Sequence, residues 1–357
     1  MTGSGKPSGG ILEWLAIRNA VEKLGAQRVW SDALSWTRFT GSLALALLVL
    51  LCLTGVFMAF NYTPVPGTAY DSVDFAQFSL PFGGLIRGVH HYAWNLLLMV
   101  MGLHLARALV VAGYQPPREL TWISGLLIML FIPVFIITGD LLPWDQKGFW
   151  STQVRTSIMG SVPVAGDWMV RLLQGGPRTG IVALTRFYVL HLLVLPGALL
   201  LLVGLHFHFV AHRGVSEPLF STRERRQVSL FPTMVNRWLL LLLIITVALG
   251  AVAYLWPVPL GDPADPTDSN YIPKPEWWVL FLNQLVAIFR GPLMVLGTAV
   301  IPGALAAGLM VLPFIDRGPE RHPLRRKALL TVIAAIGLVL LVLSIMGYLE
   351  HYGPPPA

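Results

Sequence analysis

Four histidines occur at matched spacings in two long apolar stretches. A step of 14 leads from His90 to His104 in the first stretch, and a step of 15 leads from His191 to His206 in the second. Hydrocarbon offers a histidine ring no hydrogen-bond partner, so a histidine in such a stretch usually has a function. At about 100° per residue, a step of 14 returns to within roughly 40° of one helix face, and a step of 15 to within about 60°. Pro196 can loosen the second helix and absorb the difference.

Other pairings of the nearby histidines do not share a helix face. The step from His91 to His104 is off by about 140°, and the step from His191 to His208 by about 100°. A step of 14 also covers about 21 Å of helix axis. Two facing helices with this pattern would hold two stacked bis-histidine sites, the ligation of a low-spin haem confined to electron transfer. One such histidine alone would more often be a helix residue bonded to a carbonyl, but four at matched spacing argue against that.

Two pairs of glycines repeat the same spacing. The step from Gly41 to Gly55 is the same as the step from His90 to His104, and so is the step from Gly125 to Gly139. Small residues let a neighbouring group approach a helix closely. We therefore expect the four glycines to leave flat space for a porphyrin, although either pair alone would fit ordinary helix packing.

The composition places these helices in a membrane. Hydrophobic residues make up 55% of the 357 residues, charged residues only 12%, and the mean hydropathy is +0.67, whereas soluble domains are about 25% charged. The expected fold is an all-α polytopic membrane protein, with a dihaem four-helix bundle and three further helices. Seven transmembrane helices are predicted, over about 40–62, 84–112, 120–141, 185–211, 237–256, 293–314 and 328–348.

Charges in the connections predict the orientation of the chain. Basic residues cluster in alternate connections, most densely in 213–226 and 317–327, and the intervening ones carry aspartates. By the positive-inside rule, the N-terminus is cytoplasmic and the C-terminus lies on the other side. The net charge of +7 thus reflects loop asymmetry and does not indicate nucleic-acid binding. The single cysteine, Cys52, excludes disulfides, thiolate iron–sulfur clusters and a Cys-x-x-Cys-His haem attachment within the chain.

Two long connections are expected on the outer side, level with His90 and His191. One contains Pro143-Trp144-Asp145 and the other Pro275-Glu276-Trp277-Trp278. Tryptophans at a membrane edge can be interfacial anchors. Glu276 is a carboxylate in an otherwise apolar context, which we interpret as functional.

These motifs, taken in order, resemble the cytochrome b of quinol:cytochrome c oxidoreductases, the cytochrome bc complexes. The resemblance extends from about residue 30 to 348. Seven spans, Asp145 after the Pro-Trp pair and the longer step from His191 to His206 are closer to the plastid type, which is normally split into two chains. The matching residues are Gly41-Ser42, Thr54-Gly55, Arg87, His90, His104, Arg107, Trp122, Gly125, Gly139, Pro143-Trp144, Leu184-Thr185-Arg186-Phe187, His191, His206 and Pro275-Glu276-Trp277.

The resemblance implies a bifurcated oxidation of quinol in a bacterial inner membrane. One electron would pass to a Rieske iron–sulfur protein and on to a c-type cytochrome. The other would cross the membrane through two b-type haems to quinone, coupled to proton translocation. The haem irons would be bound by His90 with His191 and by His104 with His206. The outer quinol site would comprise Pro275, Glu276, Trp277 and Asp145. A homodimer within a larger complex is implied as well.

Further residues have candidate roles under this resemblance. Arg87 and Arg107 lie one turn from histidine ligands and could pair with haem propionates, or they could be snorkelling arginines. His212 and Arg237 are candidates for an inner quinone site, or simply positive-inside charges. The chain would divide into a cytoplasmic tail (1–37) with an amphipathic surface helix over 11–30, the dihaem four-helix bundle (38–212) and a three-helix part with the quinol-site loop (213–357).

The sequence also departs from the family pattern. Phe39 stands where the plastid type has a cysteine for an additional haem, so we expect no such haem. Trp278 replaces the usual tyrosine of the quinol-site loop, and Trp238 stands where mitochondrial relatives have an aspartate. Two alternatives are disfavoured. A dihaem anchor of a formate dehydrogenase or hydrogenase lacks the Pro-Glu-Trp loop, and a transporter with buried histidines should show broken helices or inverted repeats.

Overall fold

The computed structural model describes residues 28–30, 39–176, 178–214, 227–229 and 233–353. Within these ranges, seven helices are long and apolar enough to cross a membrane, which confirms the expected all-α membrane fold. They are α3 (Phe39–Ala59), α5 (Gly83–Val110), α6 (Glu119–Asp140), the continuous α9 (Ile181–Val189), η2 (Leu190–Val194) and α10 (Leu195–Arg213), α11 (Val235–Leu255), the continuous η5 (Gly291–Leu293), η6 (Leu296–Val300) and α13 (Ile301–Ile315), and α14 (Lys327–Tyr352).

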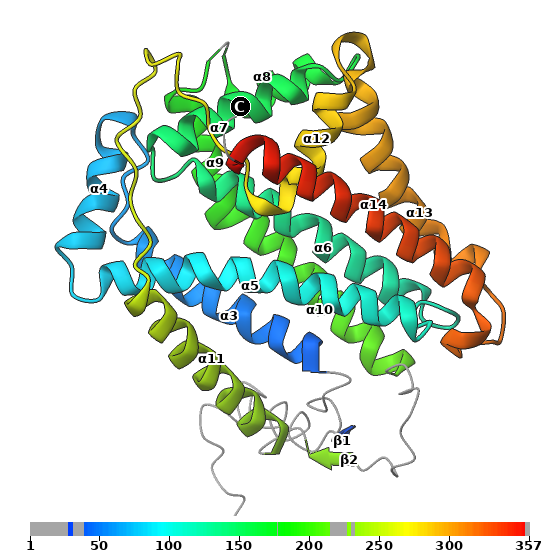
Figure 1. Ribbon diagram of the computed structural model, residues 1–357. Coiled ribbons are helices and arrows are strands. Elements are labelled where there is room, and N and C mark those ends of the chain that lie inside the picture. The colour runs from blue at the N-terminus through cyan, green and yellow to red at the C-terminus, as the bar shows by residue number, and fades with distance from the viewer. Residues whose placement is uncertain (1–27, 31–38, 177, 215–226, 230–232, 354–357) are drawn as a thin grey trace, which may run out of the picture.

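Four of these helices form a bundle (Figure 1). α3 packs along α5, and α6 packs along α10, while α5 and α6 join the two pairs. α3 has no charged residue along its whole length, and a helix satisfies its own backbone hydrogen bonds, as hydrocarbon requires. The remaining spans surround this bundle: α11 packs on α5 and α3, and α13 packs on α6.

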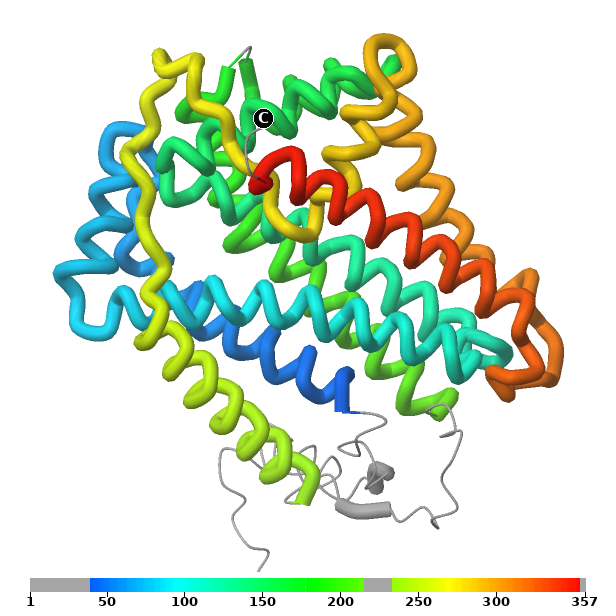
Figure 2. Tube along the Cα trace, viewed as in Figure 1, coloured from blue at the N-terminus to red at the C-terminus, as the bar shows by residue number. Residues whose placement is uncertain are grey.

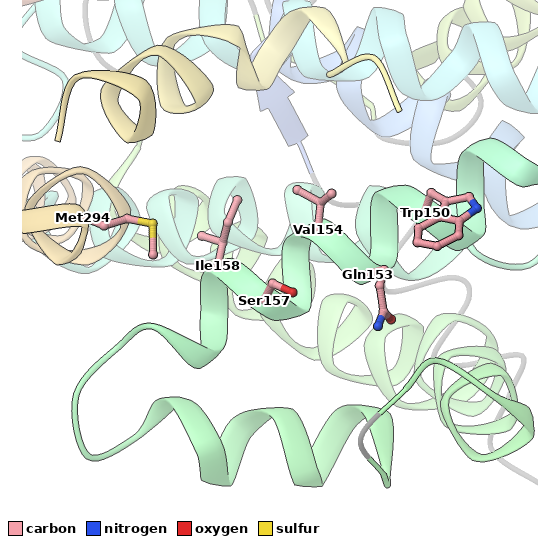
Figure 3. A pocket seen from close by; sticks show the side chains of 6 residues that line it. All are labelled: Trp150, Gln153, Val154, Ser157, Ile158 and Met294. Carbon is pink, nitrogen blue, oxygen red and sulfur yellow. The ribbon is translucent and has the colours of Figure 1, made fainter. Parts of the chain in front are cut away.

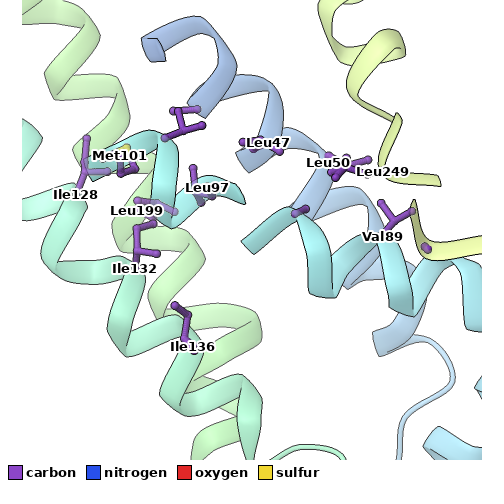
Figure 4. Packing of buried hydrophobic residues seen from close by; sticks show 14 residues of the cluster. Leu47, Leu50, Val89, Leu97, Met101, Ile128, Ile132, Ile136, Leu199 and Leu249 are labelled. Carbon is purple, nitrogen blue, oxygen red and sulfur yellow. The ribbon is translucent and has the colours of Figure 1, made fainter. Parts of the chain in front are cut away.

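The apolar core of the bundle gathers residues of α3, α5, α6, α10 and α11 (Figure 4). Leu97 of α5 is midway along the chain between His90 and His104, and Ile132 of α6 is midway between Gly125 and Gly139. Leu97 and Ile132 are fully buried in one apolar cluster together with Leu47 of α3. An apolar layer therefore separates the outer histidine level from the inner one.

The helix that carries His191 contains an irregular turn. In η2 the N–H of Leu195 bonds to the carbonyl of Leu190, five positions earlier. Pro196 has no N–H and leaves a gap in the α-helical hydrogen-bond ladder, and a π turn adds one residue at such a point. The loosening predicted at Pro196 is thus present, just before the proline. The same arrangement recurs in η6, ahead of Pro302.

The outer side is built from short helices and an extended segment. The short helices are α4 (Pro66–Phe78), α7 (Gln146–Gly160), α8 (Gly166–Gln174), η4 (Trp277–Val279) and α12 (Leu280–Ile288). The segment 257–276 runs from the end of α11 along the outer side toward η4 (Figure 2). It is bonded to the start of α7, because the N–H of Gln146 donates to Asp262 and the N–H of Ala264 donates to Trp144.

The inner side is held together by a polar cluster between two connections. Tyr114, in the α5–α6 connection, is fully buried. Its hydroxyl contacts Asp316, and Arg326 forms a 2.8 Å ion pair with the same carboxylate. Asp316 and Arg326 flank the short helix η7 (Pro323–Arg325) between α13 and α14. This cluster therefore links the α5–α6 connection to the α13–α14 connection.

The predicted surface helix over 11–30 lies almost entirely outside the described residues. Its last three residues form a strand, β1 (Arg28–Trp30), so the prediction of helix is wrong there. β1 pairs antiparallel with β2 (Gln227–Ser229). Backbone groups at this point find their partners in a distant segment, which periodicity within one stretch cannot reveal.

Candidate functional site

The four spaced histidines meet in two pairs across the bundle. The rings of His90 on α5 and His191 in η2 have centroids 6.5 Å apart at an interplanar angle of 59°. Two imidazoles that bind one metal ion from opposite sides at about 2 Å would place their centroids roughly 6 to 6.5 Å apart. The outer pair therefore fits a bis-histidine site. His104 of α5 and His206 of α10 are electrostatic neighbours at the inner level.

Each of these histidines has a hydroxyl partner on the neighbouring helix. The hydroxyls of α3 lie 2.9 Å from Nδ1 of His104 and His90, and those of α6 lie 3.1 Å from Nδ1 of His206 and His191. In every case the hydroxyl residue directly precedes one of the four glycines. The four dipeptides are Thr40-Gly41, Thr54-Gly55, Ser124-Gly125 and Thr138-Gly139.

The hydroxyls determine which ring nitrogen carries the proton. Thr54 donates its own hydrogen to the carbonyl of Leu50, and Thr138 donates to Val134. A hydroxyl has one hydrogen, so at Nδ1 these oxygens accept, and the histidine must donate. Nδ1 of His191 also lies 3.1 Å from the carbonyl oxygen of Phe135, which can only accept. At His90 and His191 the proton thus sits on Nδ1, and Nε2 keeps the lone pair that a metal needs.

The glycines adjoin the histidine rings more closely than expected. A Cβ at Gly55 would lie 3.4 Å from Cε1 of His90, and a Cβ at Gly139 would lie 2.7 Å from Cε1 of His191. At Gly41 and Gly125 the nearest atom is again Cε1 of the facing histidine. The four glycines thus make room for the edges of the facing imidazoles, and their role beside a porphyrin stays a prediction.

The rejected pairings have other surroundings. His91 packs edge-on against the rings of Tyr92 and Trp94. His208 is exposed and packs against His212, with ring centroids 4.1 Å apart. Neither ring is paired with a histidine of a second helix in these contacts, which is what the helix-face argument predicts.

The candidate propionate partners differ in what they already bind. Arg87 donates to the side chain of Gln77 on α4 and to the backbone carbonyls of Val258 and Pro259. It therefore fastens α4 and the segment after α11 to the start of α5. Arg107 lies half-buried one turn after His104. Both arginines are at the membrane-spanning helix ends, at the depth of their histidines.

Glu276 lies at the start of η4 and forms an ion pair with Lys147 of α7. The flanking residues are fixed by hydrogen bonds to two spans. The indole N–H of Trp277 donates to Asn95 of α5 at 2.8 Å, and the carbonyl of Pro275 accepts from the hydroxyl of Tyr352 on α14 at 2.9 Å. The loop that carries the carboxylate is thus held between α5, α7 and α14.

Asp145 has a structural role in this arrangement. Its carboxylate accepts a 2.7 Å hydrogen bond from the N–H of Gly148 and caps the start of α7, an interaction worth about 1 kcal/mol. The side chain is buried, and the backbone of Pro263 pairs with that of Asp145. Burial raises the pKa of Asp145, while the Gly148 N–H lowers it. The structure therefore places this candidate as a helix cap behind the loop.

One face of α7 lines a pocket with a volume of about 290 Å³ (Figure 3). This volume is near the lower limit for small-molecule pockets. The indole nitrogen of Trp150 is a buried donor without a partner among the described residues. The polar side chains that line the pocket beside the apolar ones are those of Gln153 and Ser157. The lining residues are Trp150, Gln153, Val154, Ser157 and Ile158 of α7, and Met294 before α13.

The two candidate residues for the inner quinone site belong to different parts of the helix bundle. His212 is exposed near the end of α10, which packs on α6, and its Nδ1 bonds to the carbonyl of His208. Arg237 is exposed near the start of α11, which packs on α3 and α5. The neighbouring Trp238 donates to Ser42 of α3.

Sequence reasoning missed two sets of residues in these sites. The hydroxyls before the glycines could have been found, because the whole Ser/Thr-Gly dipeptide recurs at the glycine spacing in both α3 and α6. The contact of Lys147 with Glu276 joins residues 129 apart in the sequence. No local pattern predicts it.

Comparison with known proteins agrees with this architecture. The fold matches a solved chain of a hyperthermophilic respiratory Complex III with a TM-score of 0.80 and 26% identity, over 97% of this chain and 92% of that one. A bundle of this class with two levels of paired histidines is a membrane electron-transfer protein.

Sequence comparisons identify the family. The family model described as cytochrome b (N-terminal)/b6/petB matches residues 95–263. Cytochrome b6 of Prochlorococcus marinus is 38% identical over 179 residues, 50% of this chain and 82% of that protein. The cytochrome bc complex cytochrome b subunit of Chlorobaculum thiosulfatiphilum is 31% identical over 332 residues, 91% of this chain and 76% of that protein.

The chain therefore belongs to the family of cytochrome b subunits of cytochrome bc complexes. It is a multi-pass membrane subunit of an oxidoreductase of electron transport, part of a Complex III-like assembly, and its family implies b-type haem.

Proposed function

We propose that the chain binds two b-type haems, one between His90 and His191 and one between His104 and His206. When bound, the haems supply one-electron transfer between the two levels of the membrane. The observation that supports this proposal best is the fourfold repeat of a hydroxyl at Nδ1. It orients each ring and leaves Nε2 for iron.

The arginines are proposed as partners of the haem propionates at the ends of α5. Arg87 already donates from both terminal nitrogens, and a guanidinium carries five N–H donors. It can therefore bind a carboxylate while it holds the outer segment. Arg107 would serve the inner level in the same way.

We propose that quinol is oxidised on the outer side, against α7 and the loop before η4. Glu276 accepts a proton from a quinol hydroxyl, since a base within hydrogen-bond reach is required when quinol loses electrons. Pro275 and Trp277 position that carboxylate. The pocket along α7 offers mostly apolar walls for the quinol ring.

The partners follow from the chemistry of a two-electron donor. One electron passes to a Rieske iron–sulfur protein and on to a c-type cytochrome, and the other crosses the membrane to reduce quinone on the inner side. His212 and Arg237 are candidates for the inner quinone site. Protons are released outside and taken up inside, so the reaction is coupled to proton translocation.

We also propose the setting of the subunit. Basic residues of the α13–α14 connection lie at the end opposite η4 and α7, which by the positive-inside rule is the cytoplasmic end of a bacterial inner membrane. The N-terminus would then be cytoplasmic. A homodimer, and a division into 1–37, 38–212 and 213–357, complete the proposal.

Separable loss of the two haems tests the haem proposal. We expect His104→Leu or His206→Leu to remove the inner haem signal from the reduced-minus-oxidised spectrum and to spare the outer one. His90→Leu or His191→Leu should do the reverse. His91→Leu and His208→Leu are the matched controls and should keep both signals. Loss of a haem in either control would refute the assignment.

Two further variants test the quinone sites. Glu276→Gln should slow quinol oxidation markedly while both haems stay bound and reducible from the inner side. Full turnover with an unchanged pH profile would assign the proton to another group, with Asp145 next in line. Unchanged re-oxidation of the inner haem by quinone in His212→Leu would remove His212 from the inner site.

A further inference from the structure

The ion pair between Lys147 and Glu276 joins two outer elements that are distant in the sequence. Lys147 lies in the first turn of α7, and Glu276 directly precedes η4. The side chain of Glu276 is 18% exposed and that of Lys147 is 41% exposed. The carboxylate is thus largely buried, while its cationic partner reaches water.

The lysine has acidic neighbours on more than one element. Asp140 lies at the end of α6 and Asp145 at the start of α7. Burial lowers the pKa of Lys147, but the negative charges of Asp140 and Glu276 raise it by more than burial lowers it. The pKa of Lys147 therefore lies above its usual value. Lys147 is therefore cationic throughout the physiological range. Asp140 also pairs with Arg155 at 2.8 Å, whereas the ion-pair partner of Lys147 is Glu276.

The lysine also shares a face of α7 with the pocket. From Lys147, steps of 7 and 11 lead to Val154 and Ile158, and both steps return to within about 20° of the same direction. Val154 and Ile158 line the pocket. Lys147 is therefore at the end of the pocket-lining face, where that face meets the loop of Glu276.

We propose that Lys147 is a positioning residue for the proton acceptor. Through its ion pair, it holds the Glu276 carboxylate at the start of α7 before quinol arrives. This inference rests on the proposed role of Glu276. The proton moves from a quinol hydroxyl to the carboxylate, which leaves a quinol monoanion and a neutral Glu276. The lysine keeps its charge throughout, and its ion pair with Glu276 is lost when the proton arrives.

Other charged or titratable groups face the carboxylate. His91 of α5 and Tyr352 of α14 interact with it electrostatically. The hydroxyl of Tyr352 is engaged with the carbonyl of Pro275. Among the ion pairs of the described residues, the contact with Lys147 is the one that includes Glu276. Removal of the Lys147 charge should therefore change the electrostatic surroundings of the Glu276 carboxylate directly.

The test is the pH profile of quinol oxidation by the intact complex with Lys147→Met. A nearby cation favours the ionised carboxylate, so its loss keeps the base protonated to a higher pH. We expect the acid limb of the profile to move up by about half to one pH unit, given the exposure of the lysine. The rate should fall several-fold on the acid side and approach that of the wild type on the alkaline side.

Lys147→Arg keeps the charge and is the matched control, with a profile expected to coincide with the wild type. Lys147→Gln repeats the neutral change with a polar side chain, and haem spectra verify that each variant is assembled. Lys147→Met added to Glu276→Gln should change nothing further, because the lysine acts through the glutamate. An unchanged acid limb in both neutral variants would overturn the inference.

The outcomes separate this inference from the proposed function. If Glu276→Gln slows the reaction but neutral variants of Lys147 keep the wild-type profile, the lysine is no positioning residue and Glu276 remains the proton acceptor. If Glu276→Gln turns over fully, the acceptor is a different group. A shifted profile in Lys147→Met would then have another cause, and both ideas fail.

Discussion

The two helices that carry the paired histidines reach the same two levels by different routes. α5 is a regular helix, whereas the helix from α9 to α10 fits one more residue between its histidines and contains the π turn η2 there. The helices opposite them, α3 and α6, are alike in this respect, because their Ser/Thr-Gly dipeptides have the same spacing. The depth at which a side chain lies in the bundle thus depends on the hydrogen-bond pattern of its helix and not on the number of residues alone.

The largest difference between the two routes should appear when one residue is deleted from each. Deleting Leu193 from η2 should convert the π turn to α-helix and restore the histidine spacing found in α5, so both haem signals remain. Deleting Leu103 from α5 should rotate the rest of that helix by about 100° and abolish the inner haem. Both leucines are exposed on the outside of the bundle, at 70% and 63%, so the pair is matched in burial. Haem spectra of the purified variants measure the outcome, and equal losses would refute the register argument.

The glycines offer a smaller test of the same comparison. A Cβ at position 139 would lie 2.7 Å from Cε1 of His191, but one at position 55 would lie 3.4 Å from Cε1 of His90. The first distance forces a shift and the second is an ordinary contact. We expect Gly139→Ala to lower the occupancy of the outer haem severely and Gly55→Ala to leave it nearly complete. Haem-to-protein ratios decide this, and greater sensitivity at position 55 would contradict the geometry.

The hydroxyls should produce the smallest effect. Thr54→Val removes an acceptor from Nδ1–H of His90, and a hydrogen bond at that atom makes the imidazole a better donor to iron. The midpoint potential of the outer haem should rise by a few tens of millivolts, since such a bond contributes about 1 kcal/mol. Thr40→Val is the matched change at the inner level and should move only the inner potential. Redox titration of both variants checks this, and a shift in the wrong haem would reverse the assignment of levels.

Much of this molecule could be predicted from spacing. The seven spans and the choice of His90, His104, His191 and His206 over their neighbours depend on periodicity within single helices, which the sequence records directly. The role of the hydroxyls was not predicted, because Ser and Thr in an apolar helix commonly bond to their own carbonyls. Thr54 and Thr138 do that as well as serving the histidines.

The outer side was harder to predict, since its contacts depend on how separate connections fold together. Asp145 and Glu276 are both carboxylates beside tryptophan, and Asp145 was the next candidate base after Glu276. Only the structure shows that Asp145 accepts from the N–H of Gly148 while Glu276 faces Lys147. Likewise, β1 exists through pairing with β2, which no pattern within 11–30 could indicate.

The apolar layer around Leu97 and Ile132 also bears on how the membrane voltage acts on the protein. The two histidine levels are separated by about 21 Å of helix, roughly two thirds of a hydrocarbon core of about 30 Å. An uncharged layer of this thickness takes up most of the voltage drop. Moving one electron between the levels should therefore cost or release roughly 1.6 kcal/mol for every 100 mV across the membrane. The distribution of electrons between the two proposed haems would then depend on the membrane voltage. The ratio of the two haem signals in an optical spectrum would measure it.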